Sequence, residues 1–300
     1  METSQQALRG LYVPLVTPFT PDGELAAAAL EKLASSVLDD GAAGLVALGT
    51  TGEAATLSAA ERHTVLDVCA AVCRRRGAPL IAGAGSNDTA GTARALRDLA
   101  AWPEVTAALT VVPYYTRPSP AGIVAHFRLL AAQSPVPLVV YNVPYRTGTT
   151  LSARVLSELA GIPGIVGTKH AVGGIDADTV TLLAGLPASF SVLAGDDLFA
   201  SPLLALGAAG GILASAHLRT GGFAALIAAW QSGDATRARE LGHRLVPLSA
   251  ALFAEPNPAV IKGVLHAQGM IPSPAVRLPL LPARRDTVQA ALGLLETLPV

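Results

Sequence analysis

The chain has 300 residues, of which 51% are hydrophobic and 14% charged, so it can bury the core of one large domain or two ordinary ones. Its formal net charge of −1 argues against a nucleic-acid or membrane-surface partner. Cys69 and Cys73 stand four apart in an expected helix and predict neither a disulfide framework nor a zinc site. Residues 1–6 show no signal sequence, and Pro202 and three glycines break the uncharged segment 198–216. We expect a soluble, cytoplasmic protein.

Short apolar segments alternate with helical patterns along the chain. The segments are apolar throughout rather than alternating between apolar and polar residues, which is typical of buried parallel strands. We predict eight strands, at residues 11–16, 44–48, 79–82, 105–112, 137–141, 165–168, 190–193 and 211–213. Helices are predicted after them at residues 25–39, 58–76, 88–102, 119–130, 152–159, 176–184, 198–207 and 220–230, and then at 235–253, 259–268 and 286–295.

This alternation predicts an α/β protein with a parallel sheet. An open, doubly wound sheet would need a glycine-rich fingerprint at the first strand–helix turn, but residues 16–21 read Val-Thr-Pro-Phe-Thr-Pro. Eight strand–helix repeats in roughly 230 residues match a (β/α)8 TIM barrel, which typically has about 250 residues. We therefore predict a barrel domain at residues 1–230, which carries the active site, and a C-terminal helical region at residues 231–300, packed on the barrel.

Lys169 comes at the end of the sixth predicted strand, where catalytic groups of such barrels project. Only Lys32, Lys169 and Lys262 among the 21 basic residues are lysines, so a simple surface cation would more often be arginine. Burial lowers the pKa of an ammonium group and creates a nucleophile that forms Schiff bases with carbonyl compounds. The alternative is a lysine that reaches solvent or pairs with an acid, and position alone favours this alternative.

Neighbouring strand ends carry further polar residues. Thr50 and Thr51 lie in a Gly-Thr-Thr-Gly loop before a helix, where N–H groups and hydroxyls can hold a carboxylate. Tyr115 follows the fourth strand, and Tyr141 and Arg146 follow the fifth. A phenol both donates and accepts hydrogen bonds, so it can move a proton. Each feature alone is more often structural, but their coincidence with the lysine on one rim predicts an active site.

Six groups of residues carry a resemblance that covers nearly the whole chain. They are Gly49-Thr-Thr-Gly-Glu53, Val112-Pro-Tyr-Tyr115, Tyr141-Asn-Val-Pro144 with Arg146-Thr-Gly148, Gly167-Thr-Lys169, Gly195-Asp-Asp197 and Glu255-Pro-Asn-Pro258. With these motifs the chain resembles the dihydrodipicolinate synthase/N-acetylneuraminate lyase family of class I, Schiff-base aldolases. The resemblance implies a TIM-barrel lyase that uses pyruvate.

The resemblance also implies a role for each site residue. Lys169 would form the Schiff base with pyruvate, whose carboxylate Thr50 and Thr51 would hold. Tyr141 would transfer protons, relayed through Thr51 to Tyr115, and this last residue would be donated across a dimer interface. The covalent imine would take the place of a cofactor, and no metal ion is expected.

Arg146 would bind the carboxylate of aspartate semialdehyde through its two-point fork, and Ile212 would border the pocket. This favours synthesis of 4-hydroxy-tetrahydrodipicolinate, in lysine and diaminopimelate biosynthesis. His170 stands where the synthases usually carry an acid, so two alternatives stay open. One is another 2-keto acid aldolase or dehydratase, and the other is a non-catalytic paralogue that binds a keto acid. The family implies small-molecule substrates and a homotetramer, assembled as a dimer of dimers.

Overall fold

The computed structural model describes residues 8–187 and 189–298. Residues 1–6, in which no signal sequence is visible, lie outside the described residues. Within the described ranges, no helix combines the length and the hydrophobicity needed to cross a membrane.

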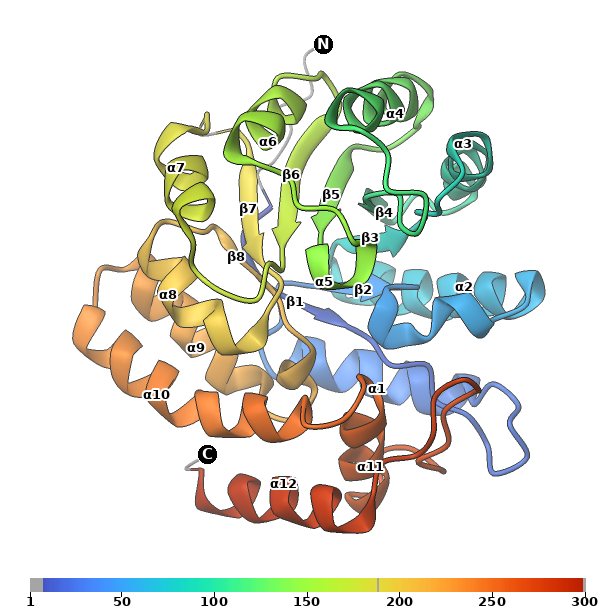
Figure 1. The fold of residues 1–300 in the computed structure, drawn as a ribbon. Coiled ribbons are helices and arrows are strands. Elements are labelled where there is room, and N and C mark those ends of the chain that lie inside the picture. The colour runs from blue at the N-terminus through green and yellow to red at the C-terminus, as the bar shows by residue number, and fades with distance from the viewer. Residues whose placement is uncertain (1–7, 188, 299–300) are drawn as a thin grey trace. The chain divides into compact units, whose positions relative to one another are not determined.

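Eight parallel strands hydrogen-bond in chain order and close into a barrel (Figure 1). They are β1 (Gly10–Pro14), β2 (Gly44–Ala47), β3 (Leu80–Gly83), β4 (Val105–Val111), β5 (Leu138–Asn142), β6 (Ile165–His170), β7 (Ser191–Ala194) and β8 (Gly210–Ile212). The predicted (β/α)8 TIM-barrel fold is confirmed, and every predicted strand end lies within two residues of the observed one. Strands β2, β5, β7 and β8 are buried at every residue, which explains why their sequences are mostly apolar, with Asn142 of β5 and Ser191 of β7 at strand ends.

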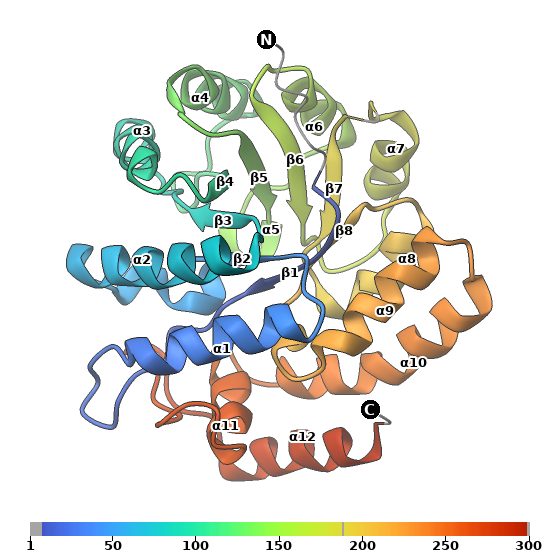
Figure 2. The same ribbon diagram turned by 180° about the vertical axis from the view of Figure 1, so that it is seen from behind.

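Helices follow the strands as the sequence predicts (Figure 2). They are α1 (Ala27–Asp39), α2 (Ala59–Arg76), α3 (Thr89–Asp98), α4 (Pro120–Gln133), α5 (Pro144–Thr147), α6 (Ala153–Ala160), α7 (Ala177–Gly185), α8 (Ala200–Ala205), α9 (Thr220–Gln231), α10 (Ala235–Leu252), α11 (Ala259–Ala267) and α12 (Arg285–Thr297). Ser58 and Glu61 form the capping box that their spacing predicts at the start of α2. The four-residue helix α5 was not predicted, because it is too short to show helical periodicity.

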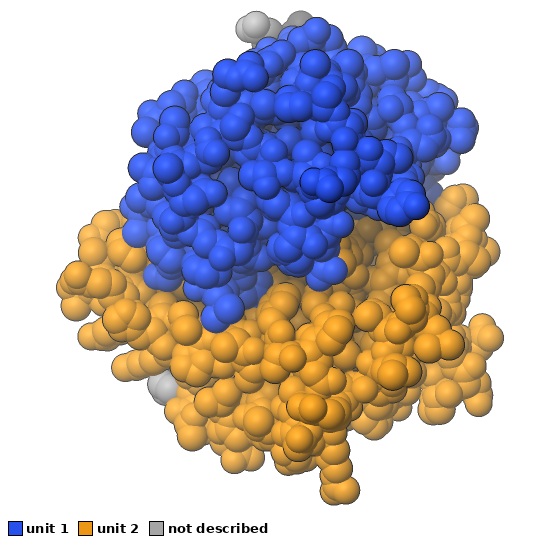
Figure 3. Space-filling model, viewed as in Figure 1, with its two compact units in different colours: residues 1–10, 81–212 blue, residues 11–80, 213–300 orange. Residues whose placement is uncertain are grey.

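The chain divides into two compact units (Figure 3). Unit 1 comprises residues 1–10 and 81–212, and unit 2 comprises residues 11–80 and 213–300. In unit 1, α3 packs beside α4, α4 beside α6, and α6 beside α7. In unit 2, α1 packs on α2, and α10 contacts α9, α11 and α12. The predicted boundary between a barrel domain at 1–230 and a helical region at 231–300 stays a prediction.

The backbone of Gly10 approaches Gly210 closely in unit 1. A Cβ atom on Gly210 would overlap the carbonyl oxygen of Gly10, whose N–H donates to the carbonyl of Ala209 at 3.1 Å. Both approaching groups are backbone, so neither can move without disturbing the pairing of β8. Gly293 in α12 is the opposite case, because a Cβ atom there would meet nothing within 4 Å.

We therefore expect Gly210→Ala and Gly293→Ala to change stability in opposite directions. Overpacking at Gly210 should lower the free energy of unfolding by roughly 1–3 kcal/mol. Alanine in place of the exposed helical glycine should raise it by up to about 1 kcal/mol. Urea denaturation of both variants measures the difference, and equal stability of the two would contradict the close approach.

Candidate active site

Lys169 lies at the carboxyl end of β6, directly opposite Tyr141 of β5. The pairing depends on a bulge, because Leu138 pairs with Ile165 whereas Val139 pairs with Gly167. The extra residue in β6 moves Lys169 one place along the ladder, and such bulges often re-aim a side chain at a functional site. The Lys169 Nζ atom lies 4.5 Å from the centre of the Tyr141 ring.

Burial dominates the electrostatics of Lys169. The residue is 6% exposed, and removal of its ammonium group from water lowers its pKa to about 8. Asp197 and Asp196 oppose this shift, whereas the positive charge of Arg146 adds to it. A lysine with this pKa has a substantial neutral fraction near neutral pH, as a nucleophile that attacks a carbonyl requires.

Glycines make room for the lysine in unit 1. A Cβ atom on Gly195 would lie 2.8 Å from Cγ of Lys169, and one on Gly167 would lie 2.5 Å from the carbonyl oxygen of Ser191. These distances are too short for real Cβ contacts, so both motif glycines leave space where β6 and β7 meet.

Acidic and basic groups surround the same end of the barrel strands. Arg146 is exposed on α5, and its guanidinium carbon lies 5.1 Å from the centre of the Tyr145 ring. Asp196 accepts a hydrogen bond from the N–H of Gly173 at 2.6 Å, and burial raises the pKa of its carboxyl group. The positive charges of Lys169 and Arg146 counteract that rise, so these groups belong to one electrostatic cluster.

His170 is buried in a directed hydrogen-bond chain. The Thr179 hydroxyl donates to Asp176 Oδ1 at 2.7 Å, so it accepts from His170 Nε2, 2.9 Å away. The other ring nitrogen, Nδ1, then accepts from the Asn142 amide at 3.4 Å. Burial lowers the pKa of His170, with Asp176 acting in the opposite direction, so the ring is neutral near pH 7. The Thr179 hydroxyl thus links His170 to the carboxylate of Asp176.

Two further predicted site residues of unit 1 differ sharply in exposure. Tyr115 is 88% exposed and has a φ of +67°, a conformation that is unusual outside glycine. Ile212, the last residue of β8, is fully buried. Tyr115 therefore makes little contact with its own chain, whereas Ile212 is part of the packed barrel.

Thr50 and Thr51 lie in unit 2, in a 3₁₀ turn at Thr50–Gly52. Thr50 is exposed, whereas Thr51 is 2% exposed and its Oγ1 accepts a hydrogen bond from the Asn257 amide at 3.0 Å. The Thr17 hydroxyl donates to the Gly52 carbonyl at 2.7 Å and fixes the end of the turn. Asn257 lies in the Glu255–Pro258 motif, but the sequence did not predict its contact with Thr51.

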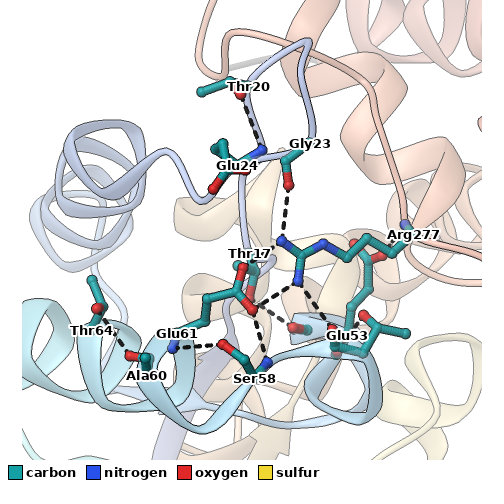
Figure 4. A network of polar contacts seen from close by, with 12 residues as sticks. Thr17, Thr20, Gly23, Glu24, Glu53, Ser58, Ala60, Glu61, Thr64 and Arg277 are labelled. Atoms are coloured by element: carbon teal, nitrogen blue, oxygen red, sulfur yellow. Dashed lines mark hydrogen bonds and ion pairs between the residues drawn. The ribbon is translucent and has the colours of Figure 1, made fainter.

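A buried ion pair holds the next residue of this loop. Lys262 of α11 donates to Glu53 Oε1 at 2.7 Å, and the two side chains are 0% and 1% exposed. The backbone N–H of Arg277 donates to the other oxygen of Glu53 at 2.8 Å. Figure 4 shows the Arg277 guanidinium reaching Glu61 and the Gly23 carbonyl, which ties the 277 segment to the start of α2. Hydrogen bonding to Arg277 lowers the pKa of Glu61 to about 2.

The predicted site residues thus fall into two groups. Unit 1 brings Lys169, Tyr141 and Arg146 into one cluster and also contains Tyr115 and Ile212, whereas unit 2 contains Thr50 and Thr51. Among the described residues, no group of three or more His, Cys, Asp or Glu side chains could hold a metal ion.

Comparison of the chain with known proteins identifies the family to which it belongs. The profile of the Dihydrodipicolinate synthetase family matches residues 7–297. The chain belongs to this family. A 4-hydroxy-tetrahydrodipicolinate synthase of Neisseria meningitidis serogroup B is 39% identical over 288 residues, which are 95% of this chain and 98% of the relative. The predicted family is therefore confirmed, and the chain is an enzyme of the synthase class.

Solved structures of dihydrodipicolinate synthases share the fold. The Acinetobacter baumannii enzyme, solved in complex with pyruvate, superposes with a TM-score of 0.92 at 35% identity, covering 97% of this chain and 98% of that one. The Thermotoga maritima enzyme gives a TM-score of 0.93 at 31% identity, covering 97% and 98%.

The two buried lysines of this family member should respond differently to replacement by methionine. Lys262→Met leaves the Glu53 carboxylate buried without its partner and should lower the free energy of unfolding by roughly 3–5 kcal/mol. Lys169→Met should leave it unchanged or raise it at pH 7, because folding disfavours the Lys169 ammonium, whose pKa falls from 10.5 to about 8. Urea denaturation at pH 7 compares them, and similar losses in both variants would contradict this assignment.

Proposed function

We propose that this chain condenses pyruvate with aspartate semialdehyde through a Schiff base on Lys169, giving 4-hydroxy-tetrahydrodipicolinate for lysine and diaminopimelate biosynthesis in the cytoplasm. The observation that carries the proposal is a buried lysine with a pKa of about 8 opposite Tyr141. The family supports it, since relatives across most of this length are named 4-hydroxy-tetrahydrodipicolinate synthases.

The chemistry begins at Lys169. Its neutral amine attacks the keto carbon of pyruvate, and loss of water from the carbinolamine gives the imine. Loss of a methyl proton then gives an enamine, whose carbon attacks the aldehyde to form the new carbon–carbon bond and regenerate the imine. The amino group of the aspartate semialdehyde then attacks the imine carbon and displaces the Lys169 amine, which closes the ring and frees the enzyme. We assign these proton transfers to Tyr141, relayed through Thr51 to Tyr115. The imine takes the place of a cofactor, and no step calls for a metal ion.

Binding of pyruvate is assigned to the turn that contains Thr50 and Thr51, whose hydroxyls and N–H groups suit a carboxylate. Ile212 is proposed to border the pocket. Tyr115 of the partner subunit is proposed to complete the relay in a dimer, two of which form the tetramer. The 88% exposure of Tyr115 supports this arrangement, because a phenol that its own chain leaves uncovered is available to a partner.

Arg146 is assigned to the carboxylate of the second substrate. Its guanidinium group is exposed yet close enough to Lys169 to lower the pKa of that lysine. A planar guanidinium matches a carboxylate in two-point fashion, so it can orient the aldehyde toward the enamine.

We expect pyruvate and borohydride to add a reduced pyruvyl group to the peptide that contains Lys169. Because the amine must be neutral to attack, the trapping rate should rise with pH and level off above about 8. Peptide mass spectrometry across a pH series measures both the site and the profile. Lys169→Arg is the control and should give no adduct, whereas an adduct on Lys32 or Lys262 would exclude the proposed nucleophile.

Arg146→Ala should weaken use of the second substrate far more than it slows imine formation, because Arg146 is the smallest of the influences on the pKa of Lys169. Loss of a charge-assisted two-point contact should cost roughly 1.5–3 kcal/mol in kcat/KM for aspartate semialdehyde. Steady-state kinetics and borohydride trapping, run side by side, separate the two steps. An equal loss of both would instead make Arg146 a structural residue.

A further inference from the structure

Asn257 contacts the Thr51 hydroxyl from the far end of the chain. Its amide nitrogen lies 3.0 Å from Thr51 Oγ1, across a sequence separation of 206 residues. Thr51 is 2% exposed, so water has little access to this oxygen. A side chain outside the predicted site therefore controls part of the hydrogen-bonding capacity of Thr51.

The hydrogen-bonding capacity of a hydroxyl group gives this contact a chemical meaning. A threonine hydroxyl has one hydrogen to donate and two lone pairs to accept with. The Asn257 N–H occupies one lone pair and leaves one donor and one acceptor. A proton relay needs that pair of positions, because its middle group must receive a proton on one side and release one on the other.

The loop and the amide are held by the same C-terminal segment. Asn257 precedes α11 by two residues, and Lys262 of α11 forms the buried ion pair with Glu53, two residues after Thr51. A charge-assisted pair with side chains at most 1% exposed fixes the distance between the segments. The Asn257–Thr51 contact is thereby set by the fold of unit 2.

We propose that Asn257 is a positioning residue that sets the direction of the Thr51 hydroxyl in proton transfer. The inference rests on the proposed function, which makes Thr51 the middle of the relay. Asn257 Oδ1 is buried and has no hydrogen-bond partner within the described residues. In the reversed amide orientation this oxygen would accept the Thr51 hydrogen and remove it from the relay, so the orientation decides the outcome.

Exchange of the pyruvate methyl hydrogens with deuterated water, followed by NMR at saturating pyruvate, reports proton transfer without a second substrate. Asn257→Ala removes the donor, and Asn257→Asp replaces it with an acceptor that draws the Thr51 hydrogen away. Both variants should slow exchange by about 10- to 100-fold, whereas the amount of Lys169 adduct that borohydride traps after long incubation should stay at the wild-type level. Asn87→Ala, which removes an exposed amide, is the matched control and should exchange like the wild type.

A double-mutant cycle separates positioning from general destabilisation. Thr51→Val should also slow exchange, and adding Asn257→Ala to it should cause no further loss, because the two residues act as one unit. Multiplied losses in the double variant, or normal exchange in Asn257→Ala, would overturn the role of Asn257. Failure of the wild type to form any adduct on Lys169 would instead overturn the proposed function.

Discussion

The ladder between β5 and β6 is the constraint on which the unit 1 site depends. Side chains alternate between the two faces of a strand, so a slip of one residue would turn Lys169 away from Tyr141. The bulge near Val166 sets this register. Gly167, which has no Cβ atom, lets the backbone of β7 lie close to the backbone of β6. The Gly-Thr-Lys order thus has a geometric cause, in which the glycine admits the neighbouring strand and the lysine projects from its end.

Two lysines are buried, but their surroundings give them different chemistry. The Glu53 carboxylate, 2.7 Å away, compensates the charge on Lys262, so this lysine acts as a structural cation. Lys169, like Lys262, lies over an aromatic ring, and desolvation is the largest cause of the lowered pKa in both. Asp197 and Asp196 act on Lys169 through their charge, whereas Glu53 also accepts a hydrogen bond from Lys262. Burial alone therefore does not identify a nucleophile, and the nearest compensating charge distinguishes the two lysines.

The sequence predicted those features of the fold that depend on local patterns of residues. Apolar runs located the strands, the Ser58–Glu61 spacing located a helix start, and the order of strands and helices predicted the barrel. The bulge could not be predicted, because Val166 continues an apolar run without interruption. The chain from His170 through Thr179 to Asp176 depends on where the fold places Thr179 of α7 relative to His170 of β6, which no spacing encodes. A role for Asn257 could have been predicted, because its motif was recognised in the sequence, but no function was assigned to the residue.

Unit 2 is built from the beginning and the end of the chain, and this has a consequence during synthesis. Glu53 precedes Lys262 by 209 residues, so at about 5–20 residues per second the carboxylate waits roughly 10–40 s for its partner. During that time burial of Glu53 would leave an unpaired charge, which is energetically costly. We therefore expect the loop that contains Thr51 to stay exposed to water until Lys262 is available. A chain that ends before α11 contains Lys169 but lacks the Lys262 ammonium that pairs with Glu53 of this loop.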